Sequence, residues 1–303
     1  GHIRFKLSAL DKDLLFSASY NNFENTRVDK TYPIENDREY SNMRFSLAYA
    51  HQFANWGIDF NTYYTQSKRL ETETRFRPLD DSSLQARTAW FVDTTELVGF
   101  YSAINYQVFE SNQLVFGVDL KRERLLDSEA TNSLDNEVLS FVQPSYQNLS
   151  LLDTGIFLQD SQYFFDKKTQ LTVGLRFDIL ELFADQFSYR IGLTHAFTDT
   201  ISAKILYGTA YRSPSFLEFT RSPEGSALPD VETMQTIEGQ IGYHAKTLHL
   251  SLTAYHNTYN DFIARKNSFH SSSDVQDTEV FANIDNQIIT GLEFDSKYII
   301  SSE

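Results

Sequence analysis

The chain has 303 residues, a formal net charge of −15, 15% aromatic residues and no cysteine. The lack of cysteine excludes a disulfide framework and a thiolate metal site. The acidic balance argues against a nucleic-acid partner, which would require clustered Lys and Arg. The sequence contains no apolar run of about 18 residues or more, so it predicts no membrane-spanning helix.

Apolar residues alternate with polar ones along most of the chain. The clearest segments are 114–121, 171–179, 201–212, 248–257 and 288–297. A period of two predicts strands, and no segment sustains helical spacing. The sequence therefore predicts an all-β, antiparallel fold with about thirteen strands.

The connections between these strands alternate in length. Short polar turns are expected near 11–13, 53–56, 110–113, 166–169, 198–200 and 245–247. Longer acidic stretches are expected at 27–39, 70–95, 126–150, 213–231 and 264–280, with a short one near 183–186. This rhythm is typical of a transmembrane β-barrel, and we expect the short turns along one rim. A soluble sandwich or propeller is the alternative, although such proteins have shorter strands and loops not sorted by length.

Strand parity predicts one apolar and one charged face. The side chains expected to face lipid include Leu175, Ile191, Ile201, Ala203, Ile205, Tyr207, Tyr211, Ile241 and Leu292. Those expected to face the lumen include Arg176, Asp178, Arg190, Ser202, Lys204, Arg212, Glu238, Glu293, Asp295 and Lys297. Tyrosines near the loop end would lie at the membrane boundary. The alternative is that the charged set is the solvated face of an open sheet.

Several segments carry recognisable motifs in a fixed order. They are GIFLQDSQYFFDKKTQLTVGLRFD (155–178), FSYRIGLTHAF (187–197), YGTAYRSPSFLEF (207–219), LPDVETMQTIEGQIGY (228–243), LSLTAYHNTYNDFI (250–263) and NIDNQIITGLEFDSKY (283–298). Together they resemble the β-barrel of TonB-dependent outer-membrane receptors. Arg212-Ser213-Pro214 departs mildly from the family's commoner Arg-Ala-Pro.

The resemblance and the strand parity together identify residues that belong to the family motifs or are expected to face the lumen. They are Gln159, Asp160, Arg176, Asp178, Arg190, Tyr207, Gly208, Arg212, Pro214, Glu218, Glu238, Gly291 and Glu293. We expect structural pairing for Glu218, Glu238 and Glu293 and assign no ligand contact to any residue.

The resemblance also implies an architecture, about 22 strands closed around a plug. On that interpretation residues 1–303 form part of one barrel domain, an open half-barrel without the plug and the C-terminal strands, with unpaired edge strands near 3–10 and 281–300.

The function implied is uptake of a scarce nutrient across the outer membrane of a Gram-negative bacterium. The nutrient expected is a ferric siderophore, with haem, cobalamin or a sugar as alternatives. The implied partners are the TonB complex, reached through the plug, and outer-membrane lipid and lipopolysaccharide. No cofactor is implied.

Catalytic spacing is absent from the sequence. There is no Gly-x-Ser-x-Gly, no His-Glu-x-x-His and no phosphate-binding glycine loop, so we assign no catalytic or metal residue. His244 and His249 fall on the expected lumen face beside the 245–247 turn, where a water-exposed role is expected and a metal or pH role is the alternative. A passive pore, a barrel enzyme and a soluble β-rich binding protein remain as alternative functions.

Overall fold

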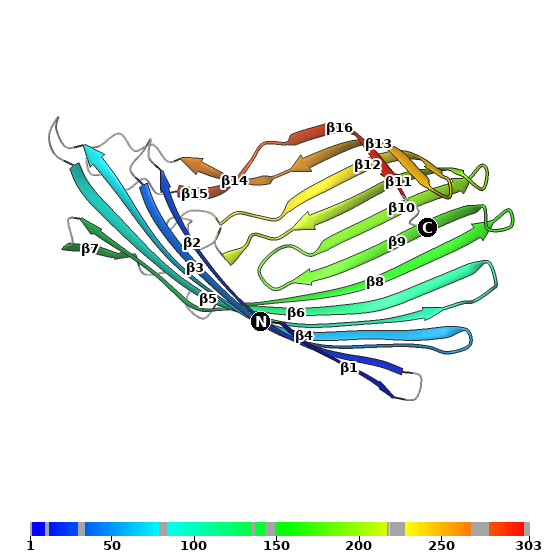
Figure 1. Ribbon diagram of the computed structural model, residues 1–303, viewed down its shortest axis with the longest axis horizontal. Helices are drawn as coiled ribbons and strands as arrows, with labels where there is room; N and C mark the ends of the chain where they lie inside the picture. Colours follow the sequence, from blue (N-terminus) through cyan, green and yellow to red (C-terminus); the bar gives the residue numbers. More distant parts are fainter. Residues whose placement is uncertain are drawn as a thin grey trace. The chain divides into compact units, whose positions relative to one another are not determined.

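The computed structural model describes residues 2–9, 12–29, 34–78, 84–134, 137–142, 149–216, 218, 228–267 and 279–299. These residues are almost all in strands (Figure 1). Within the described part of the chain, no helix is long and apolar enough to cross a membrane.

Thirteen strands form one path of hydrogen-bonded neighbours, β1-β2-β3-β4-β5-β6-β8-β9-β10-β11-β12-β13-β16, which agrees with the number predicted. Their bounds are β1 His2–Ala9, β2 Lys12–Asp29, β3 Ile34–Gln52, β4 Trp56–Pro78, β5 Leu84–Tyr106, β6 Asn112–Leu134, β8 Ser150–Phe164, β9 Thr169–Leu180, β10 Gln186–Ala196, β11 Ile201–Arg212, β12 Glu232–His244, β13 Leu248–Asn260 and β16 Gln287–Tyr298. A short β7 (Glu137–Val142) pairs with β6, and β14 (Phe262–Asn267) pairs with β15 (Glu279–Ile284) in a separate two-stranded sheet.

Several predicted loops are wrong, because strands run into them. β4 and β5 leave only 79–83 of the loop expected at 70–95, and β2 and β3 enter the one expected at 27–39. β6 and β7 occupy much of 126–150. Backbone pairing satisfies the polar groups of these segments, and their sequence shows no sustained alternation of apolar and polar residues, so a period of two does not reveal them. The expected edge strand at 281–300 is likewise divided between β15 and β16.

The chain divides into two compact units. Unit 1 comprises Gly1–His51, Asp59–Ser102 and Asp119–Asp153, and unit 2 comprises Gln52–Ile58, Ala103–Val118 and Thr154–Glu303. Unit 2 contains strands β8 to β16 and the short turns at 53–55, 107–111, 165–168, 197–200 and 245–247. The predicted turn at 11–13 falls partly outside the described residues.

Backbone hydrogen bonds join the short turns of unit 2 along one edge. Gln107 N donates to Asn55 O (2.8 Å) and Tyr163 N donates to Ser111 O (2.8 Å). In the same way, the backbone N of Ala196 donates to Lys168 O, that of His244 to Thr200 O and that of Ile299 to Thr247 O. These turns therefore share one edge, as predicted (Figure 1).

Few apolar side chains of the described residues are buried. They are Ala103, Leu125, Leu180, Phe216, Val231 and Ile263. Phe216, Val231 and Ile263 belong to segments beyond the loop ends of β11, β12 and β13. Of the described residues on the main path of strands, the buried apolar ones are Ala103, Leu125 and Leu180.

Candidate functional site

One face of unit 2 is apolar and exposed. The antiparallel registers from β9 to β16 place Leu175, Ile191, Ile205, Ile241 and Leu292 on the same face, as predicted. Their exposed fractions are 43%, 44%, 58%, 62% and 73%. A soluble protein would cover such a surface, since large contiguous apolar patches mark contacts with membranes or other proteins.

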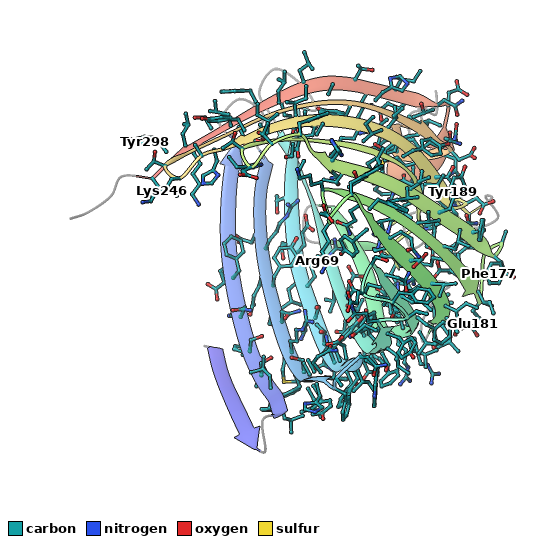
Figure 2. The ribbon with its side chains drawn as sticks, turned by 90° about the vertical axis from the view of Figure 1, so that its right-hand side faces the viewer. Arg69, Phe177, Glu181, Tyr189, Lys246 and Tyr298 are labelled. Atoms are coloured by element: carbon teal, nitrogen blue, oxygen red, sulfur yellow. The ribbon has the colours of Figure 1, made fainter. Side chains whose placement is uncertain are left out.

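Aromatic side chains border this apolar face on both sides. At the loop side lie Phe177, Phe187, Tyr189 and Tyr207, with Phe177 directly opposite Phe187 and the rings of Tyr189 and Tyr207 5.9 Å apart. Figure 2 labels Phe177 and Tyr189. The exposed aromatics at the turn edge include Phe53, Trp56, Phe109, Phe165 and Phe197. Two aromatic girdles around an apolar band are characteristic of membrane β-barrels.

The opposite face of unit 2 carries the charges. The registers place Arg176, Arg190, Lys204, Arg212, Glu238 and Glu293 together on it, as predicted. Lys204 forms an ion pair with Glu238 (Nζ–Oε1, 3.5 Å). On β9 to β16 these charged side chains therefore lie away from the apolar face.

Arg176 and Asp178 form a local pair on the charged face. Arg176 Nη2 lies 2.6 Å from Asp178 Oδ1, and Asp178 is 1% exposed. Gly155 lies against this pair, since a Cβ atom there would approach Asp178 Oδ1 to 2.5 Å. The pair thus requires a glycine on the neighbouring strand.

Gln159 and Asp160 lie on opposite faces of β8, as successive strand residues must. Gln159 accepts a hydrogen bond from Arg190 of the charged face. Asp160 accepts hydrogen bonds from Asn112 and from Gln162 (2.9 Å). These partners hold Asp160 near the turn edge.

Gly208 and Gly291 allow close packing on the charged side. A Cβ at position 208 would lie 3.4 Å from Arg190 Cβ, and one at 291 would collide with the ring of Tyr255. Glu293 is exposed and lies directly opposite Thr253.

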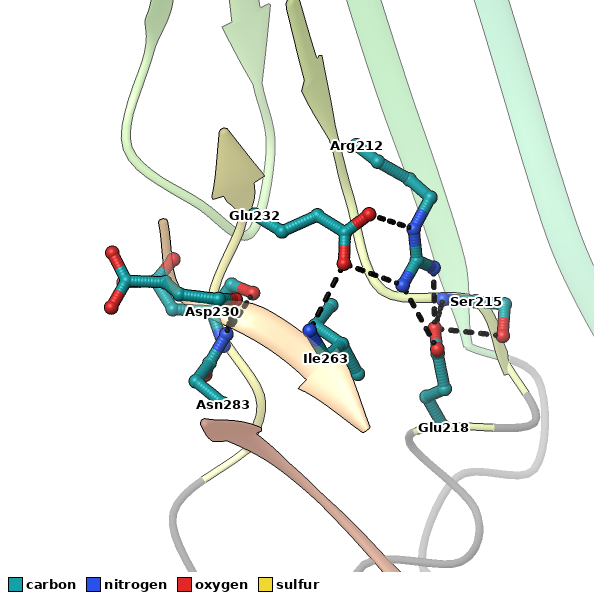
Figure 3. Close-up of polar contacts among 8 residues, drawn as sticks. Arg212, Ser215, Glu218, Asp230, Glu232, Ile263 and Asn283 are labelled. Atoms are coloured by element: carbon teal, nitrogen blue, oxygen red, sulfur yellow. Dashed lines mark hydrogen bonds and ion pairs between the residues drawn. The ribbon is translucent and has the colours of Figure 1, made fainter. Parts of the chain in front are cut away.

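Arg212 is the centre of a polar cluster at the loop end of β11 and β12 (Figure 3). Its guanidinium donates to Glu232 through Nε (2.8 Å) and Nη2 (3.0 Å), and to Glu218 through Nη1 (2.9 Å) and Nη2 (3.1 Å). Glu218 also accepts bonds from Ser215 N (2.6 Å) and Oγ (3.0 Å), and Glu232 accepts one from Ile263 N (3.0 Å). We call Arg212, Glu218 and Glu232 the arginine clasp.

The arginine clasp joins four segments. Arg212 lies directly opposite Glu232, so the clasp connects β11 and β12 to the 215–218 turn and to the start of β14. Both carboxylates are 8% exposed. Pro214, which precedes the turn, is also buried.

The electrostatics of the clasp favour its ionised form. Towards the loop end of β11 and β12, the outer face carries the polar pair Thr209 and Gln235 in place of an apolar pair. The clasp therefore lies beyond the apolar band. Burial raises the pKa of Glu232, but hydrogen bonds from Arg212 and from the Ile263 amide outweigh it, and the net pKa is lowered. The hydrogen bonds that Arg212 donates to Glu232 and Glu218 raise the pKa of Arg212.

Asn283 extends this loop-end network. Its Oδ1 accepts a bond from Asp230 N (2.7 Å), and its Nδ2 donates to Asp230 O (3.0 Å) and Asp261 O (2.7 Å). The side chain therefore ties β15 to the residues that precede β12 and follow β13 (Figure 3).

Sequence reasoning missed further ion pairs in unit 1. Arg69 pairs with Asp93 and Glu71, and Arg38 pairs with Glu71 (2.8 Å). Lys121 pairs with Asp153 (3.0 Å) and Arg124 with Glu96 (3.3 Å). Arg38, Glu71 and Asp93 fall in stretches expected to be loops, so no partner could be assigned. Among the described residues, no three His, Asp or Glu side chains gather into a possible metal site.

The comparison with protein families matches the TonB dependent receptor-like β-barrel over residues 3–299. The chain belongs to this family. Its fold is that of the family's barrels, and no curated protein sequence matches it.

Solved receptors share the fold at low sequence identity. A ferric enterobactin receptor (PfeA) from Pseudomonas aeruginosa is 15% identical with a TM-score of 0.55, covering 97% of this chain and 58% of its own. The copper transporter OprC is 16% identical with a TM-score of 0.65, covering 97% and 48%. The FrpB iron transporter from Neisseria meningitidis is 12% identical with a TM-score of 0.55, covering 98% and 56%. The chain thus spans about half the length of these structures.

Proposed function

We propose that this chain is part of the barrel wall of an outer-membrane receptor for a ferric siderophore, energised through the TonB complex. The family match over 3–299 carries this proposal. The separation of unit 2 into an apolar face with two aromatic girdles and a charged face supports it, because that pattern suits lipid on one side and an aqueous lumen on the other.

In this proposal residues 1–303 supply part of one barrel, and other parts of the receptor supply the plug and the closing strands. Leu175, Ile205 and Leu292 contact lipid and lipopolysaccharide. Arg190 and Glu238 face the lumen, where the plug transmits force from the inner membrane. The work of the protein is binding and gated transport, with no bond made or broken in the ligand.

The most specific part of the proposal is that the nutrient is a ferric siderophore. The printed names of similar structures include a ferric enterobactin receptor and the siderophore receptor PirA from Pseudomonas aeruginosa, at 15% and 14% identity. Haem, cobalamin and a sugar are the alternatives within the family.

The test is uptake by a strain that lacks the gene for this receptor. We expect loss of growth on a subset of iron-loaded siderophores, and loss of radiolabelled iron uptake when either the receptor or TonB is deleted. Uptake that survives deletion of TonB would indicate a passive pore. A defect with haem, cobalamin or a sugar, and none with siderophores, would replace the substrate and retain the receptor.

A further inference from the structure

Two histidines face each other across the β12–β13 hairpin. His244 lies directly opposite His249, beside the 245–247 turn. Ala245 N donates to Leu248 O (2.8 Å), so the next pair, His244 and His249, occupies a non-hydrogen-bonded position. Side chains approach most closely at such positions.

The two imidazoles already have a chelating separation. Their Nδ1 atoms are 3.3 Å apart and their ring centroids 5.5 Å apart. Two imidazole nitrogens bound to one metal at about 2.0–2.1 Å, with an angle of about 90–110° between them, lie ~2.9–3.4 Å apart. A metal ion would therefore need no displacement of the strands.

The surroundings leave room for the rings and for water. A Cβ at Gly242 would approach His244 Nε2 to 2.8 Å, so the glycine makes space for that imidazole. His244 is exposed and His249 is half-buried. Lys297 of β16 lies directly opposite His249 on its other side. Of the charged side chains that the registers place on this face, Lys297 is the nearest to the histidines. Its positive charge repels a bound cation.

We propose that His244 and His249 form a two-nitrogen site for a divalent transition metal, completed by water. Imidazole ligands favour Cu²⁺ over Ni²⁺ and Zn²⁺, and they do not select Mg²⁺ or Ca²⁺, which require oxygen ligands. The site lies at the turn edge, far along the strands from the arginine clasp, and does not depend on which nutrient the receptor takes up.

The test measures Cu²⁺ binding to the receptor that contains these residues, purified in detergent and stripped with a chelator. Titration calorimetry gives affinity, and electron paramagnetic resonance counts the coordinated nitrogens. We expect one Cu²⁺ with two nitrogen ligands, and a loss of affinity on the order of tenfold or more in His244→Ala and in His249→Ala. The double variant should bind at least as weakly as either single variant, because each single variant keeps one imidazole ligand and the double variant keeps none.

Two matched variants complete the test. His256→Ala removes a histidine from the other face of the same strand and should leave Cu²⁺ binding unchanged. Lys297→Gln removes the opposing charge and should strengthen binding.

Heat-modifiable migration in gels checks that each variant is folded, and His244→Gln replaces His244→Ala if the latter is not. Unchanged Cu²⁺ affinity in a folded His244 variant would overturn the proposal. An equal loss in His256→Ala would do the same, because it would indicate general binding by surface histidines.

Discussion

At the scale of single residues, Arg212 is distinguished by the burial of its partners. Exposed ion pairs contribute little to stability, because water screens them. Glu218 and Glu232 are each 8% exposed, and Arg212 makes two hydrogen bonds to each. Removing the arginine leaves two covered negative charges that repel one another, which is the costly way to break an ion pair.

Arg212→Ala should therefore loosen the 213–231 segment. We expect a loss of about 1–3 kcal/mol, less than for a fully buried pair because the Arg212 side chain is 44% exposed. Limited proteolysis should cut the variant faster within 213–231. Lys204→Ala, which breaks a longer contact, is the control and should change little. Equal proteolysis of both variants would show that the clasp does not hold the loop.

The clasp also predicts a dependence on acid. The pKa of Glu232 in the folded protein is lowered from its ordinary 4.5, so its stabilisation is present above about pH 4.5 and is lost as the pH falls through the folded value. Cleavage of 213–231 by an acid-active protease should rise below pH 4.5. The Glu232→Gln variant should not show this increase in cleavage. An increase of the same size in Glu232→Gln would mean that other groups cause the acid dependence.

Two of the three residues of the clasp could be identified from the sequence. The motif around Arg212 and Glu218 identified both residues, because they are six positions apart in one segment. Glu232 was not identified, since its position opposite Arg212 depends on a register that the intervening 213–231 segment conceals. Identifying Glu232 would have required the register between the two strands, which the sequence does not give.

At the scale of strands, prediction succeeded where apolar residues alternate on one face. The segments 171–179 and 201–212 were identified because their apolar residues alternate, and β9 and β11 include them. The outer parts of β4, β5 and β6 were taken for loops. Strand pairing there supplies the backbone hydrogen bonds, and the sequence shows no sustained alternation of apolar and polar residues.

The two faces of β11 predict opposite tolerance to charge. Ile205→Arg places a charge within the apolar band and should destabilise the protein by about 2–4 kcal/mol if it lies near the bilayer centre. Ser202→Arg adds the same side chain to the charged face and should have a small effect. Heat-modifiable migration and outer-membrane yield measure both. A reversed order would mean that the faces of β11 are exchanged.

At the scale of the whole molecule, we propose from the strands of the described residues that residues 1–303 do not act alone. The main path has thirteen strands with β1 and β16 at its ends, and bacterial single-chain barrels have an even number. The similar solved structures are roughly twice as long, with coverage of 48–61% of their chains.

We therefore expect residues 1–303, expressed alone, to form no heat-modifiable barrel and to restore no uptake in a receptor-deficient strain. The complete receptor carrying the same residues should do both. The control is the complete receptor with Arg212→Ala, which should still assemble. Uptake restored by residues 1–303 alone would contradict the strand-count argument.

The hydrogen-bonded turns of unit 2 have a consequence for sequence change. Each turn from 53–55 to 245–247 shares a backbone hydrogen bond with the next hairpin along the edge, so its length is coupled to that of its neighbour. An epitope tag inserted at 197–200 should therefore disturb two hairpins and lower the yield of assembled protein. The same tag between residues 219 and 227 interrupts none of these bonds, so insertions and recombination events should accumulate on the loop side while the turn side retains its length.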